Sequence, residues 1–227
     1  MTGQENNPGP TRISVVIPVF NGSKYIAQAI SSVRANEYAD IEIVVVDDGS
    51  TDDTAIVIDQ SCPDVRYIHQ ENAGTGAARN YGVRESTGEF IAFLDADDLW
   101  TQQKLALQVS AFASDSNLDV VWGHVQEFTE DQNPEESAGR PLAGQHPGAA
   151  LFRADALRNS GGFSIGLRNA EVVEWVSRIT TAGLQQLMLP EVVMYRRLHT
   201  QNKGRDNPAA HREYLLVLKR HLDRRRS

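Results

Sequence analysis

The sequence is poor in cysteine and in long hydrophobic runs. Its 227 residues contain one cysteine, Cys62, which excludes an internal disulfide framework and a cysteine-rich zinc site. No stretch approaches the roughly 20 apolar residues of a membrane span, and the polar residues 1–12 lack the apolar core of a signal peptide. We therefore expect a soluble, cytoplasmic protein with a flexible N-terminus at residues 1–12.

A broad basic surface is also lacking. The formal net charge is −8, and ten of the 22 Lys and Arg residues lie within residues 194–227. Such an acidic body argues against nucleic acid as a partner. The basic C-terminal end is either a solvated helix end or a weak contact with an anionic membrane surface or another subunit.

Strand-like and helix-like segments alternate along the chain. The runs 13–20 and 41–48 are rich in β-branched residues and too continuous for one exposed face, which is typical of strands covered on both sides. Between them, apolar residues recur at helical spacing after Ser23, a plausible capping residue. The expected strands are 13–20, 41–48, 65–70, 90–95, 119–128 and 191–197, and the expected helices are 23–36, from 50, 73–86, 101–113, 154–159, 171–182 and from about 208. This order predicts an α/β fold with an open, mostly parallel sheet flanked by helices.

The length suits one domain with two parts. Residues 13–128 form the larger α/β half. Residues 129–148 combine Pro, Gly and charge without periodicity, which predicts either a mobile connection that carries a lid or acceptor loop, or a passive surface loop. Residues 149–227 then complete the same domain with a small C-terminal part and a terminal helix.

The segment FIAFLDADD, residues 90–98, leads from a buried strand directly into Asp95, Asp97 and Asp98. Alternation in an extended chain places Asp95 and Asp97 on the same side. Hard cations such as Mg²⁺ prefer oxygen ligands, and open α/β sheets bind ligands beyond the carboxyl ends of their strands. The segment therefore predicts a divalent-metal site, and the alternative is an acidic turn that caps the next helix.

Two glycine motifs that bind phosphate are missing. GTG at 74–76 would need a third glycine where Arg79 stands, and no GxxxxGK[ST] loop exists. These absences exclude the dinucleotide fingerprint and the P-loop nucleoside triphosphatases. Arg79 is instead a cation near a helix start, where backbone N–H groups already favour anions, or a salt-bridge partner of a nearby acid.

Several ordered motifs together resemble the family 2 glycosyltransferases with the GT-A fold, from Ile13 to Asn202. SVVIPVFNGSKYIAQAISSV is similar to the family's opening strand and helix, VVVDDGSTDDT to its nucleotide-base loop, and ENAGTGAARNYGVRESTGEFIAFLDADD to the helix that leads to its DXD motif. The resemblance implies a non-processive, inverting enzyme. It would use Mg²⁺ or Mn²⁺ to move a sugar from a nucleotide diphosphate donor, with a UDP-sugar favoured, to an acceptor hydroxyl.

The resemblance also assigns donor-binding residues. Pro18 and Phe20 would line the base pocket, Asp48 would hydrogen-bond a uracil-like edge, and Arg79 would lie near the nucleotide. Residues 13–128 would thus bind the nucleotide sugar, and the part from 149 onward would face the acceptor.

The DXD motif corresponds to Asp95, Ala96 and Asp97, all of which would contact the donor or its metal. Asp97 would reach the metal directly, while Asp95 would hold ribose or sugar oxygens or a metal-bound water. His199 stands where the family can add a metal or diphosphate ligand, although a lone histidine is as often structural.

The catalytic base is less clear, because this chain departs from the family's Glu-Asp pair. In GGFSIGLRNAEVVEWVSR the usual base position is Val172, which cannot accept a proton. Glu171 precedes it and Glu174 lies one helical turn later, so either carboxylate is a candidate base. We favour Glu171, and its alternative role is a helix N-terminal charge stabilised by the dipole.

Two other functions stay open. Val172 motivates a sugar-nucleotide-binding protein that has lost its base. A nucleotidyltransferase would need a Gly-rich basic loop after the first strand, where only Gly22 and Lys24 stand. The acceptor could be a glycan, a lipid-linked glycan, a peptide or a small molecule, and the terminal helix could pair two copies of the chain.

Overall fold

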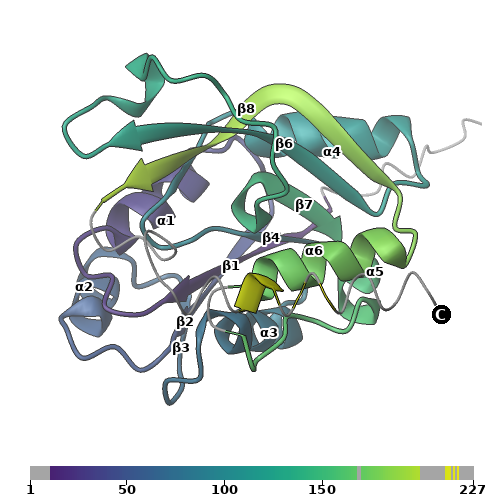
Figure 1. Ribbon diagram of the computed structural model, residues 1–227. Coiled ribbons are helices and arrows are strands. Elements are labelled where there is room, and N and C mark those ends of the chain that lie inside the picture. The colour runs from purple at the N-terminus through teal and green to yellow at the C-terminus, as the bar shows by residue number, and fades with distance from the viewer. Residues whose placement is uncertain (1–10, 168–169, 200–212, 216, 218, 220–227) are drawn as a thin grey trace, which may run out of the picture.

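The computed structural model describes residues 11–167, 170–199, 213–215, 217 and 219 (Figure 1). Residues 1–10 and most of the basic C-terminal end lie outside this part. The predicted helix start near residue 208 also lies outside it, and the described residues of 213–219 are helical.

The described residues form one sheet of eight strands in the order β3-β2-β1-β4-β7-β6-β8-β5. The strands are β1 (Ile13–Val19), β2 (Ile41–Asp47), β3 (Arg66–His69), β4 (Phe90–Phe93), β5 (Leu99–Trp100), β6 (Val120–Thr129), β7 (Ala150–Arg153) and β8 (Gln186–Leu198). The helices are α1 (Ile26–Arg34), α2 (Thr54–Ser61), α3 (Thr75–Glu85), α4 (Lys104–Ser114), α5 (Ala154–Asn159) and α6 (Glu171–Thr181), with 3₁₀ turns η1 (Pro134–Glu136) and η2 (Pro147–Ala149).

The first four major strands are parallel, as the alternation of strands and helices predicted. β1 pairs with β2 and β4, and β2 pairs with β3, each in parallel register. Parallel neighbours need a long crossover, which α1, α2 and α3 provide. This arrangement brings the carboxyl ends of β1, β2 and β4 to one edge of the sheet.

The second half of the sheet mixes directions. β7 is antiparallel to both β4 and β6, β8 is parallel to β6, and the two-residue β5 is antiparallel to β8. The sheet is therefore mixed and mostly parallel. β5 and β7 were not predicted: β5 has two residues, which are too few to show a periodicity, and β7 directly follows a segment without one.

Helices cover both faces of the sheet, and alternate residues of each strand divide between two cores. One core contains Val15 and Ile17 together with apolar residues of α1, α2 and α4. The other contains Val16 together with α5 and α6, and a smaller cluster lies under α3. In Figure 1, α3, α5 and α6 accordingly lie together on one side of the sheet.

The loops after β1 and β2 are joined by hydrogen bonds between backbone and side chain. The Gly22 N–H donates to Thr54 Oγ1 at 2.9 Å, and the Ser23 N–H donates to Asp52 Oδ2 at 3.1 Å. The expectation that Ser23 caps α1 is wrong: the helix begins at Ile26 after Tyr25, and no side chain caps it. Ser23 is instead held by the loop that precedes α2.

The segment 129–148 is partly attached to the sheet. Leu142 and Val125 of β6 exchange two backbone hydrogen bonds, of 2.8 and 3.0 Å. The segment ends in η2, directly before β7.

Within the part of the chain that the structure describes, none of the helices has the length and apolar character needed to cross a membrane.

Candidate active site

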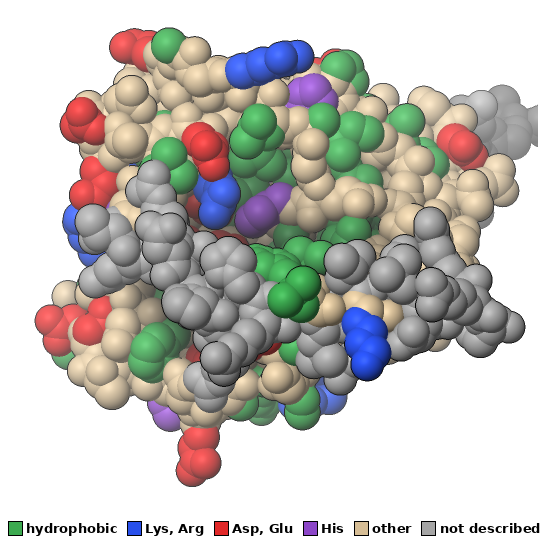
Figure 2. All heavy atoms as spheres, in the orientation of Figure 1, with side chains coloured by type: hydrophobic (Ala, Val, Ile, Leu, Met, Phe, Trp, Pro, Cys, Tyr) green, Lys and Arg blue, Asp and Glu red, His purple; other side chains and the backbone are tan. Residues whose placement is uncertain are grey.

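Acidic side chains follow the carboxyl ends of β2 and β4. Asp48 comes directly after β2, and Asp95, Asp97 and Asp98 come after β4. In Figure 2, side chains of both charge signs and a histidine gather near the middle of the face that Figure 1 presents, beside hydrophobic side chains. This is the edge at which open α/β sheets bind their ligands.

Asp48 is buried and organises the turn before α3. Its carboxylate accepts hydrogen bonds from the N–H groups of Ala73 and Gly74, both at 2.8 Å, and from Gln70 Nε2 at 2.7 Å. Gly74 has a φ of 95°, in the region that favours glycine. Asp48 thus fixes the entry to α3, the helix that carries Arg79.

The two predicted base-pocket residues differ in exposure. Pro18 is buried in β1 opposite Val46 of β2. Phe20 directly follows β1, and 51% of its surface is exposed. An exposed aromatic ring at a strand end can stack on a flat ligand, so Phe20 has the access that a base-binding residue needs.

Arg79 is a buried cation between two carboxylates. Its Nη2 donates to Asp95 Oδ1 at 2.6 Å, and its Nη1 lies 3.6 Å from Glu171 Oε1. The guanidinium also lies over the ring of Phe163, 5.3 Å from its centroid. Among the described residues, neither Nε nor Nη1 has a hydrogen-bond acceptor. Arg79 therefore has the salt bridge that was its alternative role, and the bridge places it against the DXD motif.

Asp98 is the buried member of the acidic turn. Its N–H donates to Asp95 O at 3.0 Å, and its carboxyl accepts from the Arg197 N–H at 2.9 Å. Burial, together with the charges of Asp97 and Asp95, raises the pKa of Asp98 well above its ordinary value. Asp98 thus joins the turn after β4 to β8.

The structure brings His199 to the DXD motif. His199 Nε2 lies 2.8 Å from Asp97 Oδ2, although the two residues are 102 positions apart. Arg197, two residues before His199, also contacts Asp97: its Nε donates to Asp97 O at 2.9 Å. The end of β8 therefore holds Asp97 through both its side chain and its backbone.

A second set of possible ligands contains one residue that was not predicted, His146. Asp95, Asp98 and His146 each offer one ligand atom, and these atoms lie within 4.8 Å of one another. Burial lowers the pKa of His146 to about 4, so its imidazole is neutral near pH 7 and can bind a metal. His146 lies in the segment 129–148, which has no recognisable motif, and only the fold shows that it reaches the turn after β4.

This donor set fits a divalent cation. Carboxylate oxygens suit Mg²⁺ and Mn²⁺, and imidazole nitrogen suits first-row transition metals. Asp95, Asp97 and Asp98 belong to the same short turn, with His199 beside Asp97 and His146 beside Asp95 and Asp98. The residues present can therefore hold Mg²⁺ or Mn²⁺ at the carboxyl end of β4.

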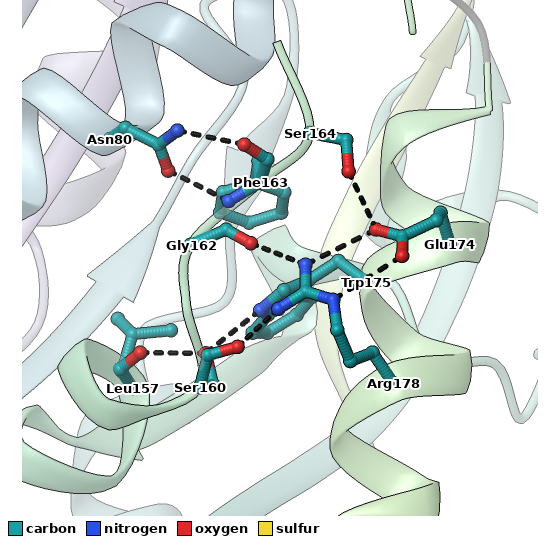
Figure 3. A network of polar contacts seen from close by, with 9 residues as sticks. All are labelled: Asn80, Leu157, Ser160, Gly162, Phe163, Ser164, Glu174, Trp175 and Arg178. Atoms are coloured by element: carbon teal, nitrogen blue, oxygen red, sulfur yellow. Dashed lines mark hydrogen bonds and ion pairs between the residues drawn. The ribbon is translucent and has the colours of Figure 1, made fainter. Parts of the chain in front are cut away.

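Glu174 belongs to a network that holds the turn before α6 (Figure 3). Its carboxylate accepts from Ser164 Oγ at 2.8 Å and from Arg178 Nη2 at 3.1 Å. Arg178 also donates to the backbone oxygens of Ser160 and Gly162. Glu174 is 3% exposed, and these contacts give it a structural role.

Glu171 lies on the same helix and faces α3. It is the first residue of α6, and its side chain reaches Arg79 and lies beside Gly76 of α3. Val172, at the family's base position, is half-buried, and Val173 is exposed. Of the two candidate bases, Glu171 is the one linked through Arg79 to Asp95.

Comparison with known proteins identifies the family. Residues 14–171 match the model of Glycosyl transferase family 2, which covers most of the chain. The chain belongs to glycosyl transferase family 2, and the resemblance stated above is confirmed.

Relatives of known sequence support this assignment. The chain is 44% identical over 123 residues to an uncharacterized glycosyltransferase of Nostoc sp., a match that covers 50% of this chain and 38% of that protein. It is 29% identical over 216 residues to the glycosyltransferase GlyG of Streptococcus pneumoniae, which covers 91% of this chain and 66% of the relative. The matched part thus spans less than two thirds of either relative.

Solved structures share the fold. Residues 1–349 of TarS from S. aureus, in complex with UDP-GlcNAc, superpose with a TM-score of 0.76 at 20% identity, covering 92% of this chain and 65% of that chain. The mannosyltransferase PcManGT from Pyrobaculum calidifontis, in complex with GDP-Man and Mn²⁺, gives 0.67 at 23% identity, covering 95% and 63%. The predicted GT-A type α/β fold is therefore confirmed.

Proposed function

We propose that this chain is a metal-dependent glycosyltransferase that moves a sugar from a nucleotide diphosphate donor to an acceptor hydroxyl, in a single inverting transfer. The observation that carries the proposal is the turn after β4, where Asp97 contacts His199 at 2.8 Å and Asp95 contacts Arg79 at 2.6 Å. A UDP-sugar is favoured, because the structural neighbour with the higher TM-score is in complex with UDP-GlcNAc.

The residues divide the work by position. Phe20 would stack on the nucleotide base, and the turn that Asp48 holds before α3 would hydrogen-bond the edge of that base. Asp97 and His199 would hold Mg²⁺ or Mn²⁺, and Asp95 would hold sugar or ribose oxygens. When bound, the cation would stabilise the negative charge that develops on the departing diphosphate.

The transfer step needs a proton acceptor on the other side of the sugar. In this proposal the Glu171 carboxylate takes the proton from the acceptor hydroxyl, whose oxygen forms the new bond to the anomeric carbon. The bond from that carbon to the diphosphate oxygen breaks, and its electron pair leaves with the nucleotide. Attack from the side opposite to the leaving group inverts the anomeric configuration.

The variant Asp97→Asn tests this proposal. It removes the charge that faces His199, so we expect kcat to fall at least about 100-fold while the fold is retained. Release of nucleotide diphosphate from UDP-sugars with Mn²⁺ measures the rate, and thermal melting measures the fold. Asp155→Asn is the control, because that side chain is 95% exposed on α5. Near-normal turnover in Asp97→Asn would remove the metal step.

A binding protein without transferase activity is the second candidate. It is favoured by Val172 at the base position and by the engagement of Glu171 with Arg79. Thermal-shift titration with UDP and GDP, each with and without Mn²⁺, identifies the nucleotide. Stabilisation by a nucleotide sugar, with neither transfer nor donor hydrolysis across glycan, lipid-linked, peptide and small-molecule acceptors, would favour this candidate.

We further propose a reducing, cytoplasmic location, which the buried free thiol of Cys62 supports.

A further inference from the structure

Tyr25 makes an unusual set of contacts just before α1. Its ring stacks on His199, with centroids 5.4 Å apart and planes inclined by 29°. The guanidinium of Arg197 lies over the same ring, 4.8 Å from its centroid. The Tyr25 hydroxyl donates to Glu130, which also forms an ion pair with Lys24 at 2.7 Å.

Two groups that contact the Tyr25 ring, His199 and Arg197, also hold Asp97, and Lys24 Nζ lies 4.9 Å from the same ring centroid. His199 contacts the Asp97 carboxylate at 2.8 Å, and Arg197 Nε donates to the Asp97 backbone oxygen at 2.9 Å. The Arg197 N–H donates to Asp98 as well. Arg197 is near the end of β8, and His199 directly follows that strand. One aromatic ring therefore contacts both side chains.

We propose that Tyr25 is a positioning residue for the acidic turn, which holds Arg197 and His199 against Asp97 without itself touching metal or substrate. The inference rests on the proposed function, in which Asp97 and His199 are metal ligands. Cation–π contact and ring stacking each contribute modest free energy, but they remove rotamer freedom from two long side chains. Groups that orient metal ligands typically change metal affinity about 10- to 100-fold when they are lost.

Glu130 extends this restraint to the segment 129–148. It is the residue directly after β6, and its carboxylate is held by Lys24 and Tyr25 from the start of α1. The hydrogen bond from Lys24, followed by the charges of Lys24, His199 and Arg197, lowers the pKa of Glu130. Tyr25 therefore joins three parts of the chain, namely the start of α1, the end of β8 and the turn after β6.

Two substitutions at Tyr25 separate the ring from the hydroxyl. Tyr25→Leu removes the stacking surface, and Tyr25→Phe keeps it but loses the hydrogen bond to Glu130. The matched control is Tyr81→Leu, because Tyr81 also carries an arginine over its ring, Arg84 at 4.2 Å, but lies on α3 against Val44 and Val46. Glu130→Gln is a further surface variant that weakens the anchor without touching the ring.

Amide hydrogen exchange in the metal-free protein measures the position of the turn directly. The Asp98 N–H bonds Asp95 O, and the Arg197 N–H bonds the Asp98 carboxyl. We expect Tyr25→Leu to raise exchange of both amides at least about fivefold, with a smaller rise for Tyr25→Phe and Glu130→Gln and none for Tyr81→Leu. Unchanged exchange in Tyr25→Leu would overturn the proposal. If that variant does not fold, Tyr25→Met removes the ring as well, and unchanged exchange in Tyr25→Met would do so.

Calorimetric titration of Mn²⁺ in the presence of UDP supplies the second readout. We expect Tyr25→Leu to weaken Mn²⁺ binding about tenfold, Tyr25→Phe about threefold or less, and UDP binding without metal to stay unchanged. Wild-type affinity in Tyr25→Leu contradicts the positioning role. If the wild-type protein itself binds no Mn²⁺, the metal step of the proposed function fails, whereas the exchange measurement still decides the role of Tyr25.

Discussion

Arg79 is the residue that joins the turn after β4 to the start of α6. Its buried guanidinium contacts Asp95 of the DXD motif and Glu171 at the start of α6, and it lies over Phe163. A buried charge is stable only when partners surround it. The positions of Asp95 and Glu171 are therefore coupled through one side chain.

The two glutamates of α6 should separate into a catalytic and a structural residue. We expect Glu171→Gln to lower kcat at least about 100-fold. Glu174→Gln should keep kcat within a few-fold but lose about 1–3 kcal/mol of unfolding free energy, because the buried Arg178 and Ser164 contacts lose a charged acceptor. Initial rates and urea denaturation of both variants measure these effects. Full activity in Glu171→Gln together with a loss in Glu174→Gln would reverse the assignment.

Motifs predicted the site residues that lie on contiguous segments, but not those that arrive from elsewhere. The sequence indicated Asp95 and Asp97 because they follow a buried strand, and the family resemblance added Asp48 and His199. His146 and Tyr25 carry no such signal. His146 lies in a segment without periodicity. The sequence predicts Tyr25 only as an ordinary helix residue, and its contact with His199 at the end of β8 is visible only in the fold.

At the scale of elements, the turn between α5 and α6 is fastened on both sides. Asn80 of α3 exchanges two hydrogen bonds of 2.8 Å with the Phe163 backbone, and Arg178 of α6 holds the carbonyl groups of Ser160 and Gly162 (Figure 3). This double attachment places Phe163 under Arg79. The turn thus fixes the distance between α3 and the start of α6.

Gly162 should be hard to replace. Its φ is 67°, and a Cβ there would lie 2.6 Å from Asn80 Oδ1. We expect Gly162→Ala to cost about 2–4 kcal/mol, the sum of backbone strain and a disturbed Asn80 pair. Gly183→Ala is the matched control, since its φ is 80° but no atom lies within 4 Å of the added Cβ, and strain alone should cost about 1–2 kcal/mol. Equal losses in urea denaturation would show that the Asn80 contact is unimportant.

Most elements could be predicted from periodicity and apolar runs, and β5 and β7 could not. All six expected strands and the helices from 23 to 182 correspond to observed elements, with ends shifted by a few residues. β8 begins at Gln186 rather than 191, and Pro190, a residue type that argues against a strand interior, separates its first four residues from the predicted run. β7 is antiparallel because of the path of the segment 129–148, which local sequence does not encode.

At the scale of the whole molecule, α4 is attached to the sheet by a buried lysine. Lys104 is fully buried, and its Nζ donates to Gln108 Oε1 at 2.7 Å and to Ala150 O of β7 at 3.1 Å. The ammonium also lies 4.7 Å from the Trp100 ring centroid. Burial lowers the pKa of Lys104 well below its ordinary value.

Lys104 should make the stability of the protein rise with pH. The unfolded chain keeps the lysine proton up to about pH 10.4, whereas the folded chain releases it at lower pH. Between these two values the unfolded state binds more protons, so unfolding free energy increases with pH. We expect wild type to gain stability over Lys104→Met between pH 7 and about pH 9.5, measured by urea denaturation. A constant difference between the two proteins would contradict this.

The order in which the strands follow one another has a consequence for biosynthesis. The acidic turn after β4 is made early, but its backbone and side-chain restraints come from Arg197 and His199, about 100 residues later. While a ribosome is still producing the intervening part, the emerging polypeptide already contains Asp48, Arg79 and the DXD aspartates. It becomes competent to bind a cation in the proposed manner only when β8 and His199 have been added. Translation through His199 is therefore the step that completes the proposed catalytic centre.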